Sequence, residues 1–214
     1  MPSTTIIVSL AIFIVSFLVG ILTYYVLAYE KKEKRKKQIE DIISLSINFV
    51  IYIWIGKILV NLSKFLTDPL AILAYPSNSY ALYIATLFIC INLLYRKLRH
   101  HEEIGLIAEA FIPVFLTASF TYEFLQLVVE HHSYNLSYLV FLAISTIAYL
   151  LLYSKMSAPY QTILFALLLL IGQLILTITS NITIFAYRLL PIYFIILILL
   201  VLILSINHKK RKVS

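Results

Sequence analysis

Long apolar runs separated by short polar gaps occupy almost the whole chain. Each run is near the ~20 residues that a helix needs to cross roughly 30 Å of hydrocarbon. Helices satisfy their own backbone hydrogen bonds in lipid, so the pattern predicts an all-α, seven-helix bundle in a single transmembrane domain, residues 1–214. The predicted spans are approximately Thr5–Ala28, Ile42–Phe65, Ser79–Tyr95, Ile104–Val129, Leu136–Tyr153, Pro159–Asn181 and Ile184–Ile206.

The composition agrees with a membrane protein. Hydrophobic residues make up 62% of the 214 residues, and the mean hydropathy is +0.96. Such a chain has more apolar surface than a soluble domain can bury. Cys90, inside the third span, is the single cysteine. Because one thiol forms neither an internal disulfide nor a CxxC pair, thiol-oxidase chemistry is excluded.

Basic residues fall in every second gap, which predicts the orientation of the chain. By the positive-inside rule these gaps are cytoplasmic, so the C-terminus is expected inside and the N-terminus outside. We therefore expect a basic cytoplasmic loop at 30–41, an outer loop at 66–78 and a basic cytoplasmic tail at 207–214. The net charge of +7 is explained by anchoring to anionic lipid, and no nucleic-acid partner is expected.

Charged residues at membrane depth are rare and mark candidate sites. At 1.5 Å rise per residue, Lys57 lies roughly 5 Å outward of the bilayer midplane, and Glu123 and Arg188 lie ~10 Å outward. These charges come from the second, fourth and seventh spans, so we expect them to converge in the outer half of the membrane. Polar residues predicted near the same layer or the outer edge are Gln173, Gln126 and Asn61.

Two interpretations of these charges remain open. In the structural one, Lys57 and Arg188 extend to the outer interface and Glu123 pairs with one of them. In the functional one, they line a polar cavity open to the outer leaflet, where Lys57 and Arg188 face an anionic headgroup.

Other titratable residues give weaker signals. Glu109 shares a helix face with Glu123 but lies ~21 Å away along the axis, too far for paired-carboxylate catalysis. Pro113 is expected to kink the fourth span. The clusters at 100–103 and 130–132 lie on opposite sides of the membrane, so no metal site is expected. His131 or His132 remains a candidate general base facing outward.

The order of these features resembles that of bacterial prolipoprotein diacylglyceryl transferases, which transfer a diacylglyceryl group from phosphatidylglycerol to a lipoprotein cysteine. The segment Ile42–Leu62 resembles that family's second span, with Gly56 and Lys57 near its Gly-x-Arg. Pro76–Ala81 falls at its Gly-Gly-x-Ser-x-His segment, and Glu109–Pro113 resembles its Asp-x-x-x-Pro. The signature Arg-x-Gly-Asn then falls on Glu123–Gln126.

The departures from this family concern the reacting residues. Ala81 stands at the histidine, Glu123 at the signature arginine and Gln126 at the asparagine. The Arg and Glu expected in the sixth span are absent around Gln173. Since the reaction needs a base and cations that hold phosphate, the transferase activity is not expected.

Three functions follow from these observations. The first is a non-catalytic protein of the bacterial cytoplasmic membrane that binds phospholipid, such as phosphatidylglycerol, or a lipidated peptide, as an accessory to a membrane-protein partner. The second is a lipid- or lipoprotein-modifying transferase with a rearranged site. The third is a small-solute transporter or its substrate-binding subunit, although the chain has no repeat and few internal prolines. No cofactor is expected.

Overall fold

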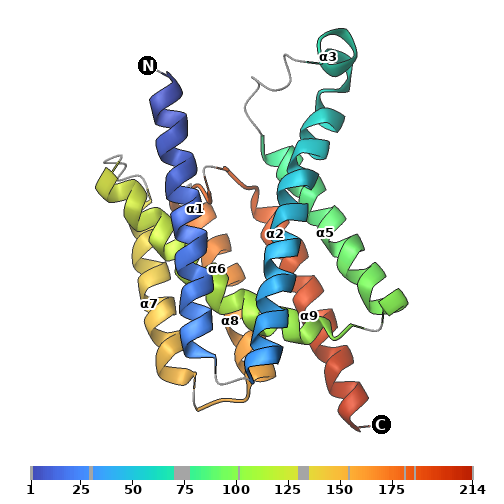
Figure 1. Ribbon diagram of the computed structural model, residues 1–214. Helices are drawn as coiled ribbons and strands as arrows, with labels where there is room; N and C mark the ends of the chain where they lie inside the picture. Colours follow the sequence, from blue (N-terminus) through green and yellow to red (C-terminus); the bar gives the residue numbers. More distant parts are fainter. Residues whose placement is uncertain are drawn as a thin grey trace. The chain divides into compact units, whose positions relative to one another are not determined.

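The structure, a computed structural model, describes residues 2–28, 31–69, 78–100, 102–129, 135–153, 155–180, 182–185 and 187–213. These residues are helical apart from short connections and one isolated bridge, which confirms the all-α class (Figure 1). The helices are α1 (Pro2–Leu27), α2 (Lys32–Val60), α3 (Leu62–Thr67), α5 (Ser79–His100), α6 (Ile104–Val129), α7 (Leu136–Leu152), α8 (Ala158–Ser180) and α9 (Pro191–Val213).

Five helices, namely α1, α2, α5, α6 and α8, have the length and hydropathy to cross a membrane. Two further apolar helices are shorter, namely α7 and the segment Pro191–Ile206 of α9. These helices have the length and composition that a multi-pass membrane protein needs. The count of seven spans and the orientation of the termini stay predictions.

The chain divides into two compact units. Unit 1 comprises Met1–Lys31 and Ala108–Ser214, and unit 2 comprises Lys32–Ile107.

In unit 2, α2 packs along α5. A Cβ added to Gly56 would lie 2.7 Å from the carbonyl oxygen of Ala81, so only glycine permits this approach. The Tyr52 and Phe88 rings meet edge to face with centroids 5.5 Å apart, and Asn92 donates to the Tyr52 hydroxyl at 3.2 Å. These contacts align the two helices along their length.

The helix α2 begins at Lys32, so most of the basic segment predicted as a loop at 30–41 is helical. Lys, Arg, Glu and Gln have high helix propensity, so the charges do not stop a helix. Lys36 and Glu40 also form an i,i+4 ion pair at 3.6 Å, which supports an exposed helix weakly. Of the outer segment predicted at 66–78, residues 70–77 lie outside the described residues.

An ion-pair cluster fixes one end of unit 2. Arg96 on α5 pairs with Asp41 on α2 and, at 2.6 Å, with Glu102 in front of α6. The Gln38 amide donates to the carbonyl of Leu106 at 2.8 Å. Arg96 therefore joins three segments of unit 2.

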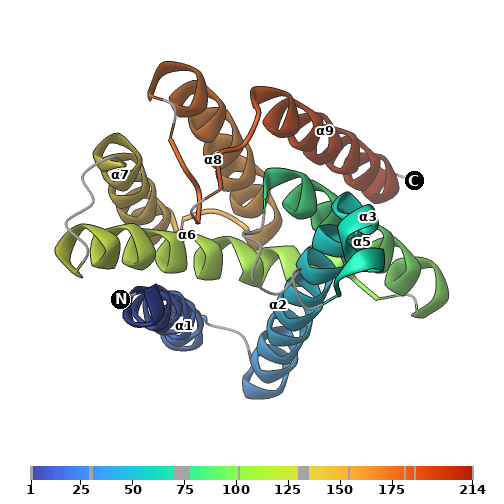
Figure 2. The ribbon, with the colours of Figure 1, turned by 90° about the horizontal axis from the view of Figure 1, so that it is seen from above.

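Unit 1 is organised around α6. In its most apolar stretch 44% of the residues are buried, against 22% in both α1 and α8. Figures 1 and 2 show α1 on one side of α6, whereas α7 and α8 lie on its other side. The helix continues through Pro113, and the kink expected there stays a prediction.

The helices α1 and α6 approach closely at Gly20. A Cβ at this position would lie 2.6 Å from the carbonyl oxygen of Val114 and 3.0 Å from the Cβ of Ala118. Main-chain atoms of a helix do not move aside easily, so the contact requires glycine.

The last helix starts later than predicted. The predicted span began at Ile184, but α9 begins at Pro191, and residues 182–185 and 187–190 are not helical. Ile184 and Tyr187 exchange two backbone hydrogen bonds of 2.9 Å, and Phe185 adopts a left-handed backbone with φ 48°. Proline has no backbone N–H to donate to the carbonyl four residues earlier, so a helix seldom extends in front of it. It is favoured at the first position of a helix. We name residues 182–190 the inserted segment.

Replacing Gly20 by alanine is expected to destabilise unit 1. The added methyl group overlaps a backbone oxygen, and such overpacking typically costs about 1–3 kcal/mol. We expect Gly20→Ala to lower the thermal unfolding midpoint of the detergent-purified protein by several degrees. Gly105→Ala is the matched control, because a Cβ there meets nothing within 4 Å. Equal midpoints for the two variants would contradict the close contact.

Candidate functional site

A buried polar cluster lies in unit 1 at the end of α6. Its central group is the carboxylate of Glu123, whose residue is only 5% exposed. The Asn135 amide, at the start of α7, donates to Glu123 Oε2 at 3.0 Å. An ionised carboxylate is costly to remove from water unless polar groups solvate it. We name this carboxylate and the polar residues joined to it the Glu123 cluster. Its members are Glu123, Asn135, Thr183, Tyr138, Gln173 and Ser119.

Asn135 also binds the inserted segment. Its Nδ2 donates to the carbonyl oxygen of Thr183 at 3.0 Å and to Thr183 Oγ1 at 2.9 Å. The backbone N–H of Thr183 donates in return to Asn135 Oδ1 at 3.2 Å. The amide thus pairs with a backbone N–H and C=O as a neighbouring strand would. Such partners are required because non-helical backbone is tolerated in a membrane only when its polar groups are satisfied.

The cluster extends to α8 through a tyrosine. Gln173 Nε2 donates to the hydroxyl of Tyr138 at 3.0 Å, and both residues are almost fully buried. The Glu123 carboxylate lies close enough to this hydroxyl to act on it electrostatically. Side chains from α6, α7, α8 and the inserted segment therefore form one polar group.

Ser119 adds an incompletely satisfied hydroxyl to the cluster. It is 1% exposed and lies one turn before Glu123 on α6. Thr117 and Thr121 on the same helix donate to carbonyls four residues earlier, at 2.7 and 2.8 Å. Ser119 Oγ instead interacts with the Tyr138 hydroxyl, and in the described part of the chain it completes no hydrogen bond of ordinary geometry.

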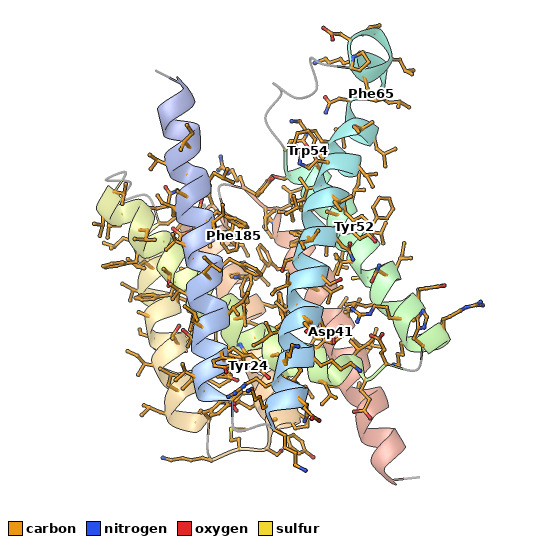
Figure 3. All side chains as sticks on the ribbon, viewed as in Figure 1. Tyr24, Asp41, Tyr52, Trp54, Phe65 and Phe185 are labelled. Carbon is orange, nitrogen blue, oxygen red and sulfur yellow. The ribbon has the colours of Figure 1, made fainter. Side chains whose placement is uncertain are left out.

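Aromatic packing holds the inserted segment beside the cluster. The Phe185 ring lies 5.0 Å from that of Tyr122, 5.8 Å from Phe13 and 6.1 Å from Phe115, centroid to centroid. Phe13 and Phe115 lie near the middle of α1 and α6, and Figure 3 shows Phe185 at about mid-height of α1. Ile182 and Leu189 are also buried. The segment therefore enters unit 1 instead of crossing its end.

The predicted site residues are divided between the two units. Lys57 and Asn61 belong to unit 2, whereas Glu123, Gln126, Gln173 and Arg188 belong to unit 1. The convergence of Lys57 with Glu123 and Arg188 concerns both units and stays a prediction.

Within unit 2, Lys57 is 5% exposed. Its ammonium lies 5.0 Å from the centroid of the Trp54 ring, within cation–π range. The Asn61 amide donates to the Lys57 carbonyl at 2.9 Å. Figure 3 labels Asp41, Tyr52 and Trp54 in this order along α2.

Within unit 1, the structure brings Glu123 and Gln173 together but not Glu123 and Arg188. Arg188 was predicted to lie in the seventh helix, but it lies in the inserted segment and is exposed. No ion pair joins it to Glu123, although both residues are described. Gln126 donates to the Tyr122 hydroxyl at 3.3 Å.

The remaining predictions concern possible bases and metal ligands. Glu109 acts electrostatically on Tyr149 of α7 and does not belong to the Glu123 cluster. The base candidates His131 and His132 lie outside the described residues. Among the described residues, no three His, Cys, Asp or Glu side chains form a group that holds a metal ion.

Several members of the cluster were not predicted from the sequence. Asn135, Thr183, Tyr138 and Ser119 are uncharged, and depth along a helix says nothing about which face they occupy. One signal was present, because asparagine directly before a helix is a favoured N-cap. In the structure Asn135 is the N-cap of α7, but its side chain makes no capping bond and binds Glu123 and Thr183 instead.

Comparisons with protein-family models, curated proteins and solved structures give no match to this chain.

Removing the Asn135 amide is expected to destabilise unit 1. Asn135→Ala leaves a buried carboxylate and the Thr183 backbone without their partner, and each unsatisfied buried group typically costs about 1–3 kcal/mol. We expect a clear fall in the thermal unfolding midpoint of the purified protein. Asn61→Ala is the control, since the Asn61 amide bonds a carbonyl one turn away. A midpoint for Asn135→Ala no lower than that of the control would contradict the importance of the amide.

Proposed function

We propose that this protein is a multi-pass protein of the bacterial cytoplasmic membrane that binds a phospholipid or lipidated peptide from the outer leaflet without catalysing its conversion. It crosses the membrane seven times with its N-terminus outside. It serves as an accessory to a membrane-protein partner.

One observation carries this proposal. Glu123 and Gln173, from helices far apart in the sequence, meet in one buried cluster through Tyr138. They stand where the resemblance to diacylglyceryl transferases places residues that hold the lipid substrate. Buried polar side chains in apolar helices are costly unless they are used or paired. The position of the cluster thus supports lipid handling at the place where the resemblance expects it.

The chemistry of the cluster favours binding over catalysis. A carboxylate at position 123 repels the phosphate that an arginine would hold, and Ala81 offers no base. Lys57 and Arg188 remain the basic residues proposed to face a lipid phosphate. The alternative of a transferase with a rearranged site needs His131 or His132 as its base, and no observation in the described residues favours it.

One observation favours transport as a second candidate function. The inserted segment places non-helical backbone beside the middle of α1 and α6, next to a buried carboxylate. In many transporters, non-helical backbone near the middle of the membrane forms part of the substrate site. Uptake of a solute by proteoliposomes, lost on Glu123→Ala but not on Lys155→Met, would select this function.

Lipid retention by the purified protein tests the main proposal. We expect native mass spectrometry to show bound phospholipid on the wild-type protein. The double variant Lys57→Met, Arg188→Met should retain at least about tenfold less, since each basic contact contributes about 1 kcal/mol. Lys155→Met, which removes an exposed charge between α7 and α8, is the control and should retain lipid normally. A wild-type protein without phospholipid, or equal retention by all three, would refute the proposal.

A further inference from the structure

Three oxygen atoms converge on one nitrogen in the Glu123 cluster. Asn135 Nδ2 lies 3.0 Å from Glu123 Oε2, 3.0 Å from the Thr183 carbonyl oxygen and 2.9 Å from Thr183 Oγ1. We name these three oxygens the oxygen triad. An amide nitrogen carries two hydrogens, so it cannot give each of three acceptors its own hydrogen bond.

A primary ammonium group fits this triad better than the amide does. It carries three hydrogens and a full positive charge. The three distances are those of ordinary N–H···O hydrogen bonds, and a charge-assisted bond to a carboxylate is roughly twice as strong as a neutral one. The amide of Asn135 therefore occupies the position of an ammonium group.

The oxygen atom of the Asn135 amide indicates which group a ligand carries next to its ammonium. Asn135 Oδ1 accepts the backbone N–H of Thr183 at 3.2 Å, so the site has one donor beside its three acceptors. A ligand that replaces the amide needs an acceptor close to its ammonium group. The headgroup of an aminophospholipid has both, since an ammonium and a phosphate are joined by a short carbon chain.

The burial pattern gives the site a rim and a base. Glu123, Ser119 and Tyr138 are buried, whereas Asn135 and Thr183 are only half-buried. A headgroup can thus reach the triad by displacing the Asn135 side chain at the rim. Arg188, in the inserted segment five positions after Thr183, is exposed and supplies a positive charge on the same segment for the phosphate.

We propose that the oxygen triad of Glu123 and Thr183 binds the primary ammonium of an aminophospholipid headgroup, and that the Asn135 amide holds this place when no lipid is bound. The inference rests on the proposed function, because it names the lipid class. It differs from an expectation of phosphatidylglycerol, whose headgroup offers neutral hydroxyls to the carboxylate in place of a cation.

Chemical rescue tests the triad without any lipid. In Asn135→Ala the triad is empty, so methylammonium chloride is expected to raise the thermal unfolding midpoint of this variant by several degrees. Sodium chloride and tetramethylammonium chloride at the same ionic strength should not, since neither offers three N–H donors. Wild-type protein and the double variant Glu123→Gln, Asn135→Ala should show no such gain. Absence of rescue, or equal rescue by sodium, would overturn the ammonium site.

Lipid competition tests the ligand and remains available if Asn135→Ala does not fold. Wild-type protein is incubated with equal amounts of phosphatidylethanolamine and phosphatidylglycerol in detergent, and the bound lipid is measured by native mass spectrometry. We expect at least a fivefold preference for phosphatidylethanolamine, lost in Glu123→Gln. Equal binding of both lipids would overturn this inference while leaving the proposed lipid-binding function intact. If neither lipid binds, the ammonium at the triad does not come from a lipid, and the proposed lipid-binding function is refuted as well.

Discussion

Unit 1 depends on the hydrogen bonds that the side-chain amide of Asn135 makes. A buried, non-helical segment of an apolar protein must find partners for its backbone N–H and C=O groups. Within the inserted segment, Ile184 and Tyr187 satisfy each other's backbone N–H and C=O groups. The Asn135 amide satisfies the backbone N–H and C=O of Thr183. The same side chain solvates the Glu123 carboxylate. One residue thus holds together the end of α6, the start of α7 and the segment before α9.

Packing around α6 explains why the cluster forms at this place. Gly20 brings α1 into backbone contact with one side of the helix. Phe185 packs its ring against aromatic residues of both helices despite its left-handed backbone. A bulky residue with positive φ is uncommon and persists when the surrounding structure demands it. Strained backbone beside a buried carboxylate is typical of a binding site, and this agrees with the function that we propose.

Much of the helical pattern is predictable from hydropathy, whereas its ends depend on other properties. The predicted span Ile104–Val129 matches α6 in full, because polar residues flank it on both sides. The start of α2 was missed since its charged residues form helices well. The late start of α9 was missed because a buried apolar segment has the same hydropathy whether or not it is helical. Within the site, charge and polarity at membrane depth identified Glu123 and Gln173. Asn135 and Thr183 act through tertiary hydrogen bonds, which no periodicity records.

A double-mutant cycle between Glu123 and Asn135 tests the central interaction most directly. The free energies of unfolding of the wild-type protein, Glu123→Ala, Asn135→Ala and the double variant are measured in the same detergent. If the two side chains are bonded as described, the coupling free energy is between about 0.5 and 3 kcal/mol. A coupling free energy near zero would show that the two side chains do not interact. The oxygen triad would then not exist, because the Glu123 carboxylate would not share the Asn135 amide with the two oxygens of Thr183.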